Sequence, residues 1–131
     1  MLGEAIRIWA AGHLEKGREV TKSGPYRWTG HPLYLGSALV GVGVAIASHS
    51  VTVAVITIVY LATMLGAAIR SEEAGLRGKF GREYADYRSG LVVDASRRFS
   101  AARAVRNREH RAVLGLLAVI ILLALKIRLL L

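Results

Sequence analysis

The most informative stretch of the chain is SGPYRWTGHPLYLG, residues 23–36, which leads directly into an apolar run. Both prolines of the protein, Pro25 and Pro32, lie in this stretch. Each proline fixes its own φ and favours extended backbone at the residue before it, Gly24 or His31. Polar side chains at the depth of a membrane segment are costly and are usually functional. We therefore expect a stiff polar loop that carries the chemistry of the protein.

Three apolar runs place the chain among helical membrane proteins. Hydrophobic residues make up 53% of the 131-residue chain and gather in residues 32–47, 51–69 and 112–125. A membrane-spanning helix needs about 20 apolar residues, with about 17 as the lower limit. The second run is long enough and the first is marginal, whereas the third is long enough only if Lys126 and Arg128 extend to the polar boundary. The pattern predicts an all-α integral membrane bundle.

Basic residues gather beside the hairpin that the first two runs form. Eleven of the eighteen Lys and Arg residues lie in residues 70–111, and four lie in residues 13–30. By the positive-inside rule both segments face the cytoplasm, so the hairpin tip at His49 faces the opposite side. The third run ends beside the tip, where Lys126 and Arg128 oppose the rule. We interpret the net charge of +9 as attraction to anionic lipid. No nucleic-acid-binding motif accompanies the basic residues, so nucleic acid is not the expected partner.

Small residues predict a close contact between the first two apolar helices. Ser37, Gly41 and Ala45 are four residues apart in the first run, and Ala62 and Gly66 have the same spacing in the second. Such spacing lets transmembrane helices approach closely. We expect a tight antiparallel hairpin, preceded by a short N-terminal helix that does not span the membrane.

The second apolar helix is expected to leave the membrane through Glu72 and Glu73, because no helix breaker precedes Gly75. Beyond it, four apolar or aromatic residues repeat on one helix face: Leu76, Phe80, Tyr84 and Tyr87. They predict an amphipathic cytoplasmic helix, lying under the membrane or over the 13–34 loop. The pattern leaves open whether the two tyrosines pack in a core or contact a ligand.

Histidine and cysteine content limits the chemistry. No cysteine is present, which excludes disulfides, thiolate metal sites and cysteine nucleophiles. The four histidines lack the spacing of metal ligands, so no metal site is predicted. We expect His13, His49 and His110 to be solvated or interfacial. His31 differs from them, because it stands between a proline turn and a helix start.

Two groups of residues, one on each side of the apolar hairpin, form a combined motif. The first is GPY at 24–26 with GHPLYLG at 30–36, and the second is EE at 72–73, Leu76, FG at 80–81 and EY at 83–84 with Tyr87. In its order and spacing the motif closely resembles the isoprenylcysteine carboxyl methyltransferase family. Related phospholipid methyltransferases share much of the pattern, which covers about residues 13–90.

The resemblance implies a bundle of transmembrane helices with an S-adenosylmethionine site on the cytoplasmic side. The residues it assigns to the cofactor pocket are Val20, Thr21, Tyr26, His31, Pro32, Leu33 and Tyr34. It places Glu72 at the methyl-transfer centre as the catalytic residue. The implied acceptor is lipid-like, of the isoprenylcysteine carboxylate type, so membrane lipid and prenylated small molecules are the expected partners. A phospholipid N-methyltransferase and a non-catalytic membrane subunit of the same fold remain alternatives.

The chain departs from the family pattern in two ways. Gly30 stands where the family usually has an arginine, whose place Arg27 or Arg70 would have to take. The chain also begins at what resembles the end of an earlier transmembrane helix. We therefore expect a short, N-terminally truncated member: either the start is placed late, or a second copy completes the pocket in a homo-oligomer. The basic and apolar segment 97–131 lies outside the shared core of this single domain, residues 1–131.

Overall fold

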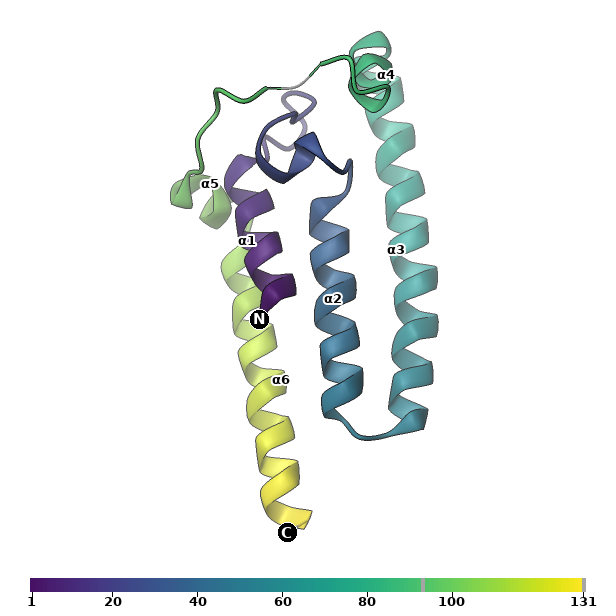
Figure 1. Cartoon of the computed structure of the whole chain (residues 1–131), viewed down its shortest axis with the longest axis vertical. Helices are drawn as coiled ribbons and strands as arrows, with labels where there is room; N and C mark the ends of the chain where they lie inside the picture. Colours follow the sequence, from purple (N-terminus) through teal and green to yellow (C-terminus); the bar gives the residue numbers. More distant parts are fainter. Residues whose placement is uncertain (93, 131) are drawn as a thin grey trace.

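The computed structural model describes residues 1–92 and 94–130, and the regular elements in these ranges are all helical (Figure 1). The longer helices are α2 (Pro32–Ala47), α3 (Val51–Phe80) and α6 (Glu109–Leu130). The shorter elements are α1 (Leu2–His13), the 3-10 turn η1 (Gly24–Arg27), α4 (Arg82–Arg88) and α5 (Ala101–Arg106). The predicted all-α membrane bundle, with a hairpin of apolar helices and a C-terminal apolar helix, is confirmed.

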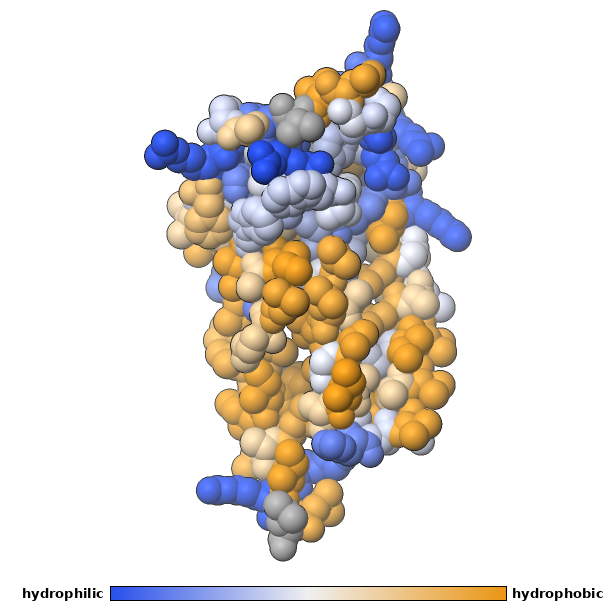
Figure 2. Space-filling view, in the orientation of Figure 1, coloured by the Kyte–Doolittle hydropathy of each residue, from blue (hydrophilic) through white to orange (hydrophobic). Residues whose placement is uncertain are grey.

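On the face shown in Figure 2, apolar side chains form a belt across the middle of the molecule, and most of the polar side chains gather toward its two ends. Ile46 is 70% exposed, and Ile56 and Leu122 are exposed to a similar degree. An exposed apolar surface of this extent is typical of a protein embedded in a membrane. By length and composition, α3 and α6 can each cross a membrane, as the second and third apolar runs predicted. The first run forms a shorter helix of 16 residues, α2.

The most extensive helix contact is between α1 and α2. A Cβ atom on Gly3 would overlap the carbonyl oxygen of Gly36, so these two glycines let the two backbones meet. In the hairpin, Gly41 of α2 faces a leucine side chain of α3, as its spacing predicted. The small residues predicted for the α3 side do not make this contact, because Ala62 is exposed and a Cβ on Gly66 would meet open space. A large side chain, and not a second small one, fills the space beside Gly41.

Helix α3 continues past its apolar part through Glu72 and Glu73, as predicted. It ends at Gly81, whose φ of +49° is a backbone conformation that favours glycine. The predicted amphipathic face is therefore divided between two helices. Its members are Leu76 and Phe80 at the end of α3, and Tyr84 and Tyr87 on α4.

The loop after α1, the end of α3 and α4 lie together at one end of the molecule (Figure 1). Lys22 Nζ is 2.8 Å from Glu83 Oε1, which joins the loop to α4. The predicted packing of the 13–34 segment against the 70–90 segment is confirmed. The hairpin tip and the C-terminal end of α6 lie at the opposite end and line a shared cavity.

Candidate active site

A cavity of about 290 Å³ lies between the loop after α1 and the end of α3. This volume is at the lower end of the range of about 300–1,000 Å³ that is typical of small-molecule sites. The loop wall consists of Leu14, Lys16, Gly17, Glu19, Val20, Thr21, Tyr26 and Gly30. The opposite wall consists of Glu72, Gly75, Leu76, Lys79, Phe80 and Tyr87. The cavity thus lies where the two halves of the sequence motif meet.

The cavity brings together four residues that the sequence placed in the site: Val20, Thr21, Tyr26 and Glu72. Pro32, Leu33 and Tyr34 lie instead in the first turn of α2, outside the cavity lining. Pro32 is fully buried, and the carbonyl oxygen of Leu33 accepts a hydrogen bond from the Ser37 hydroxyl at 3.0 Å. The Tyr34 ring centroid is 5.9 Å from that of His31. These three residues form the helix start that carries His31.

His31 lies beside the cavity, between two carboxylates of α3. Its Nε2 is 2.9 Å from Glu73 Oε1, and its Nδ1 is 3.9 Å from Glu72 Oε2. The Nδ1 atom is buried and has no hydrogen-bond partner among the described residues. The sequence did not identify Glu73 as a partner of His31, because two adjacent glutamates give no indication of which one faces the histidine. The contact fixes the ring, and His31 itself does not line the cavity but turns Nδ1 toward Glu72, which does.

The absence of a side chain at Gly30 leaves room for the guanidinium of Arg88. Arg88 Nη1 lies 3.0 Å from the position that a Cβ on Gly30 would take, and Arg88 Nη2 is 3.6 Å from Glu73 Oε1. Arg27, one of the two arginines considered from the sequence, lies over a tryptophan ring. The cation beside Gly30 therefore comes from α4, and not from Arg27 or Arg70.

The Tyr87 side chain holds residues 26–29 of the loop wall in place. The Tyr87 hydroxyl donates to the carbonyl oxygen of Tyr26 at 2.7 Å and to that of Thr29 at 3.3 Å. Burial raises the pKa of Tyr26 and raises that of Tyr87 to about 12, so both phenols keep their protons at neutral pH. Tyr84 is 1% exposed, and its ring centroid lies 6.2 Å from that of Tyr87. Tyr84 is thus a packing residue, whereas Tyr87 both packs and lines the cavity.

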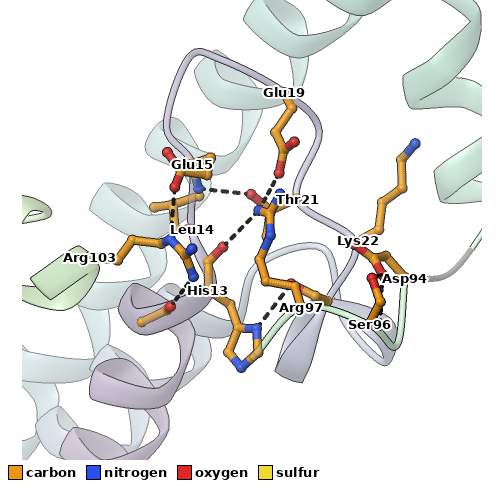
Figure 3. Close-up of polar contacts among 12 residues, drawn as sticks. His13, Leu14, Glu15, Glu19, Thr21, Lys22, Asp94, Ser96, Arg97 and Arg103 are labelled. Atoms are coloured by element: carbon orange, nitrogen blue, oxygen red, sulfur yellow. Dashed lines mark hydrogen bonds and ion pairs between the residues drawn. The ribbon is translucent and has the colours of Figure 1, made fainter. Parts of the chain in front are cut away.

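Arginines from the C-terminal segment hold residues 15–19 of the loop wall in place (Figure 3). Arg103 Nε donates to Glu15 Oε1 at 2.8 Å, and Arg97 pairs with Glu19, which lines the cavity. Inside the loop, the Thr21 hydroxyl accepts a hydrogen bond from the backbone N–H of Glu15 at 3.1 Å. Thr21 therefore shapes the loop in addition to lining the cavity. The segment that lies outside the shared motif supports a wall of the site.

His13 is buried, which corrects the expectation that it is solvated. It is 5% exposed, and its Nδ1 is 3.0 Å from the Ser23 hydroxyl oxygen. Burial, together with nearby arginines, lowers the pKa of His13. Gly24, at φ +57°, brings its backbone against the imidazole ring, which explains why the ring is covered. His49 and His110 are exposed, as expected.

Comparison with known families agrees with this geometry. Residues 4–83, more than half of the chain, match the model of the phospholipid methyltransferase family. The chain belongs to the phospholipid methyltransferase family. This confirms the family recognised from the combined motif. The matched residues include both walls of the cavity except Tyr87.

This phospholipid methyltransferase family member is also similar to a curated relative. The relative is the nickel-cobalt-cadmium resistance protein NccN of Alcaligenes xylosoxydans xylosoxydans, 36% identical over 83 residues. The alignment covers 62% of this chain and 38% of NccN, so the chain spans less than half the length of that relative. No solved structure matches the chain.

Proposed function

We propose that the protein transfers a methyl group from S-adenosylmethionine to a lipid-like acceptor at the membrane face that carries the cavity. The observation that supports this best is the convergence of both motif halves on one cavity, beside the part of α3 that directly follows its apolar run. An acceptor could keep its apolar tail in the membrane while its head enters the cavity. Binding in this geometry would align the acceptor atom with the methyl group.

The side chains that line the cavity suit S-adenosylmethionine, a zwitterion that carries a sulfonium and an adenine ring. The carboxylate of Glu72 suits its cationic groups, and the ammonium of Lys16 suits its carboxylate. Tyr26 and Phe80 offer aromatic faces for the adenine. When bound, this cofactor supplies a methyl group that is already activated on sulfur. The protein then mainly has to bind, orient and exclude water.

Glu72 is the residue that we assign to the methyl-transfer centre. It lines the cavity from α3, and its side chain is 39% exposed, so a ligand can reach it. A fixed carboxylate at this place stabilises positive charge that is carried on the sulfonium or that develops on a nitrogen acceptor. His31, held by Glu73, presents its unpartnered Nδ1 on the same side. We assign His31 to ligand positioning or proton acceptance.

Two acceptor classes fit this arrangement: an isoprenylcysteine-type carboxylate and a phospholipid amine. A carboxylate needs no base, whereas a primary ammonium must lose a proton before its nitrogen can attack the methyl group. The Glu72 carboxylate favours the amine class, since it lines the cavity and can accept that proton. The description of the matched family, phospholipid methyltransferase, supports the same class.

We also propose that the cavity faces the cytoplasm. Fifteen of the eighteen basic residues lie in residues 13–30 and 70–111, which form the cavity end of the molecule, whereas Lys126 and Arg128 lie at the other end. This distribution follows the positive-inside rule for the large majority of charges.

Methyl transfer can be tested directly with the purified protein in lipid nanodiscs and S-adenosylmethionine that is radiolabelled in its methyl group. Parallel reactions would contain phosphatidylethanolamine, a farnesylated N-acetylcysteine or neither acceptor. We expect label in the phosphatidylethanolamine fraction. Label in the prenylcysteine alone would select the carboxylate class. Cofactor binding without turnover on either acceptor would contradict catalysis and support the non-catalytic subunit.

A further inference from the structure

A second cavity, of about 310 Å³, lies between α1, α2 and α6. Among the described residues, none lines both this cavity and the active-site cavity. Its walls are mostly apolar and include Val44 of α2 and Val119 of α6. Its polar part is formed by Glu4 and Arg7 of α1 and by Ser37 of α2. We call this cavity the α2–α6 groove.

Glu4 shares the guanidinium of Arg7 with a second carboxylate, Glu109. Arg7 directs its hydrogen bonds to both carboxylate oxygens of Glu109, at 2.7 and 3.2 Å, and to Ser37. The same guanidinium is 3.7 Å from Glu4 Oε2. One guanidinium therefore faces two carboxylates, and the better geometry belongs to Glu109.

The other oxygen of Glu4 is buried without a partner. Glu4 is 7% exposed, and its Oε1 has no hydrogen-bond partner among the described residues. Burial, together with the Glu109 carboxylate, raises the pKa of Glu4. An unpaired buried acceptor costs free energy unless a donor reaches it. Because the Glu4 side chain lines the α2–α6 groove, a ligand in the groove can donate to its carboxylate.

The shape of the groove and its position in the bundle fit one kind of ligand. Glu109 is the first residue of α6 and precedes its apolar run, so the Glu4 end of the groove lies at the polar start of this helix. From Ser37 to Val44 the groove follows α2 for about 10 Å, at 1.5 Å per residue. A polar head at Glu4 and an apolar chain along α2 and α6 would occupy both parts.

We propose that the α2–α6 groove binds a membrane lipid with a primary ammonium headgroup, which donates a hydrogen bond to Glu4 while one acyl chain lies between α2 and α6. An anionic headgroup would be repelled by Glu4, and a trimethylammonium headgroup has no N–H to donate. The bound lipid is separate from the methyl acceptor, because the groove and the active-site cavity have different linings. The proposal therefore does not depend on catalysis.

Photo-cross-linking in nanodiscs without S-adenosylmethionine tests this site. The probes are phosphatidylethanolamine, phosphatidylcholine and phosphatidylglycerol that carry the same diazirine in one acyl chain. We expect phosphatidylethanolamine to label residues 40–44 and 112–119 about tenfold more than phosphatidylglycerol, the effect of one charge-assisted hydrogen bond. Glu4→Gln should remove this preference. The matched control Glu83→Gln changes a carboxylate on α4, outside the groove, and should keep it.

A second variant keeps the test independent of any folding defect in Glu4→Gln. Gly115 lines the groove, and a Cβ built on it meets open space, so Gly115→Leu should fill the groove without displacing neighbouring atoms. We expect it to remove labelling by all three probes at an unchanged unfolding temperature. Equal labelling by the three headgroups would overturn the proposal, as would a preference that survives Glu4→Gln. Cross-links between two copies at these residues, in place of lipid, would assign the groove to an oligomer interface.

A further reaction distinguishes this site from the proposed active site. After S-adenosylmethionine is added, the lipid cross-linked in the groove should stay unmethylated even if free phosphatidylethanolamine is methylated. Methylation of the cross-linked headgroup would place the acceptor in the groove and contradict a separate site. Absence of all methylation would count against the proposed function but leave the groove result unchanged.

Discussion

The two walls of the active-site cavity are held in place in different ways. The α3 wall belongs to one 30-residue helix, whose backbone hydrogen bonds keep Glu72 and its neighbours in place. The loop wall has a largely irregular backbone and depends on side chains from distant segments. Tyr87 holds residues 26–29, and Arg97 and Arg103 hold residues 15–19. Changes on the α3 wall should therefore test chemistry, whereas changes in the arginines should test the shape of the site.

The largest effect is expected on the α3 wall. Glu72→Gln keeps the size of the side chain and removes its charge, so we expect turnover to fall about 100-fold or more while cofactor affinity changes little. A group that acts mainly in the transition state has this signature. Single-turnover methyl transfer at saturating cofactor measures the rate, and Asp86→Asn, at a carboxylate of α4 outside the cavity lining, is the control. An unchanged rate would mean that Glu72 is a solvated helix residue, worth well under about 1 kcal/mol as a surface ion pair.

A smaller effect of a different kind is expected on the loop wall. Arg103→Ala removes the contacts with Glu15 and with the carbonyl oxygen of Gly12, at 2.8 and 2.7 Å. Hydrogen bonds to charged groups contribute about 1.5–3 kcal/mol, so cofactor affinity should fall about 10- to 100-fold as the loop loosens. Equilibrium binding of S-adenosylmethionine measures this loss. Arg98→Ala, at an exposed neighbouring arginine, is the control, and equal losses in the two variants would refute the bracing role.

The contact between Gly30 and Arg88 offers a third comparison. Arg88→Ala should weaken cofactor binding about fivefold, because the cation beside Glu73 and His31 is lost while the walls remain. Gly30→Arg in the Arg88→Ala background should restore most of the affinity, since the new guanidinium can enter the space that Arg88 leaves. The same binding assay decides between the two outcomes. If the double variant binds no better than Arg88→Ala, the two positions do not supply the same cation.

The smallest effect concerns pH and the packing of the loop. Because the pKa of His13 is lowered in the folded protein, unfolding takes up a proton as the pH falls below the ordinary value of 6.5. The stabilising contribution of the neutral ring is therefore complete above pH 6.5 and is lost progressively below it. The slope is at most about 1.4 kcal/mol per pH unit.

Thermal unfolding between pH 7.5 and 5.5 checks this sign. The wild type should lose stability toward low pH, and His13→Gln should lose less over the same range. His49→Gln, at the exposed hairpin tip, should behave like the wild type. A steeper loss in His13→Gln than in the wild type would show that protonation of His13 does not destabilise the fold.

The α3 wall and the helix starts could be predicted from the sequence, because their signals are local. Pro32 followed by an apolar run predicted the start of α2, and the lack of a breaker predicted that α3 continues through Glu72. The family resemblance, and not the local pattern, assigned Val20, Thr21 and Tyr26 to the site, where they line the cavity. Their roles toward a cofactor stay predictions.

The supports of the loop wall could not be predicted, because they join residues far apart in the chain. Arg103 and Glu15 are 88 residues apart, and no periodic pattern links them. The same holds for Arg88, which reaches Gly30 only because the chain turns back at Gly81. His13 was placed at the surface, since its sequence neighbours do not show that the Gly24 backbone packs on its ring. Surfaces that form only in the folded chain leave no local signal.

The central claim, that both walls surround one S-adenosylmethionine site, is tested most directly by ultraviolet cross-linking of the radiolabelled cofactor to the purified protein in nanodiscs. We predict label in peptides from both walls, residues 14–30 and 72–87. Excess unlabelled cofactor should remove this label, and Arg103→Ala should reduce it. Label confined to other segments, or label that excess cofactor does not remove, would contradict the account.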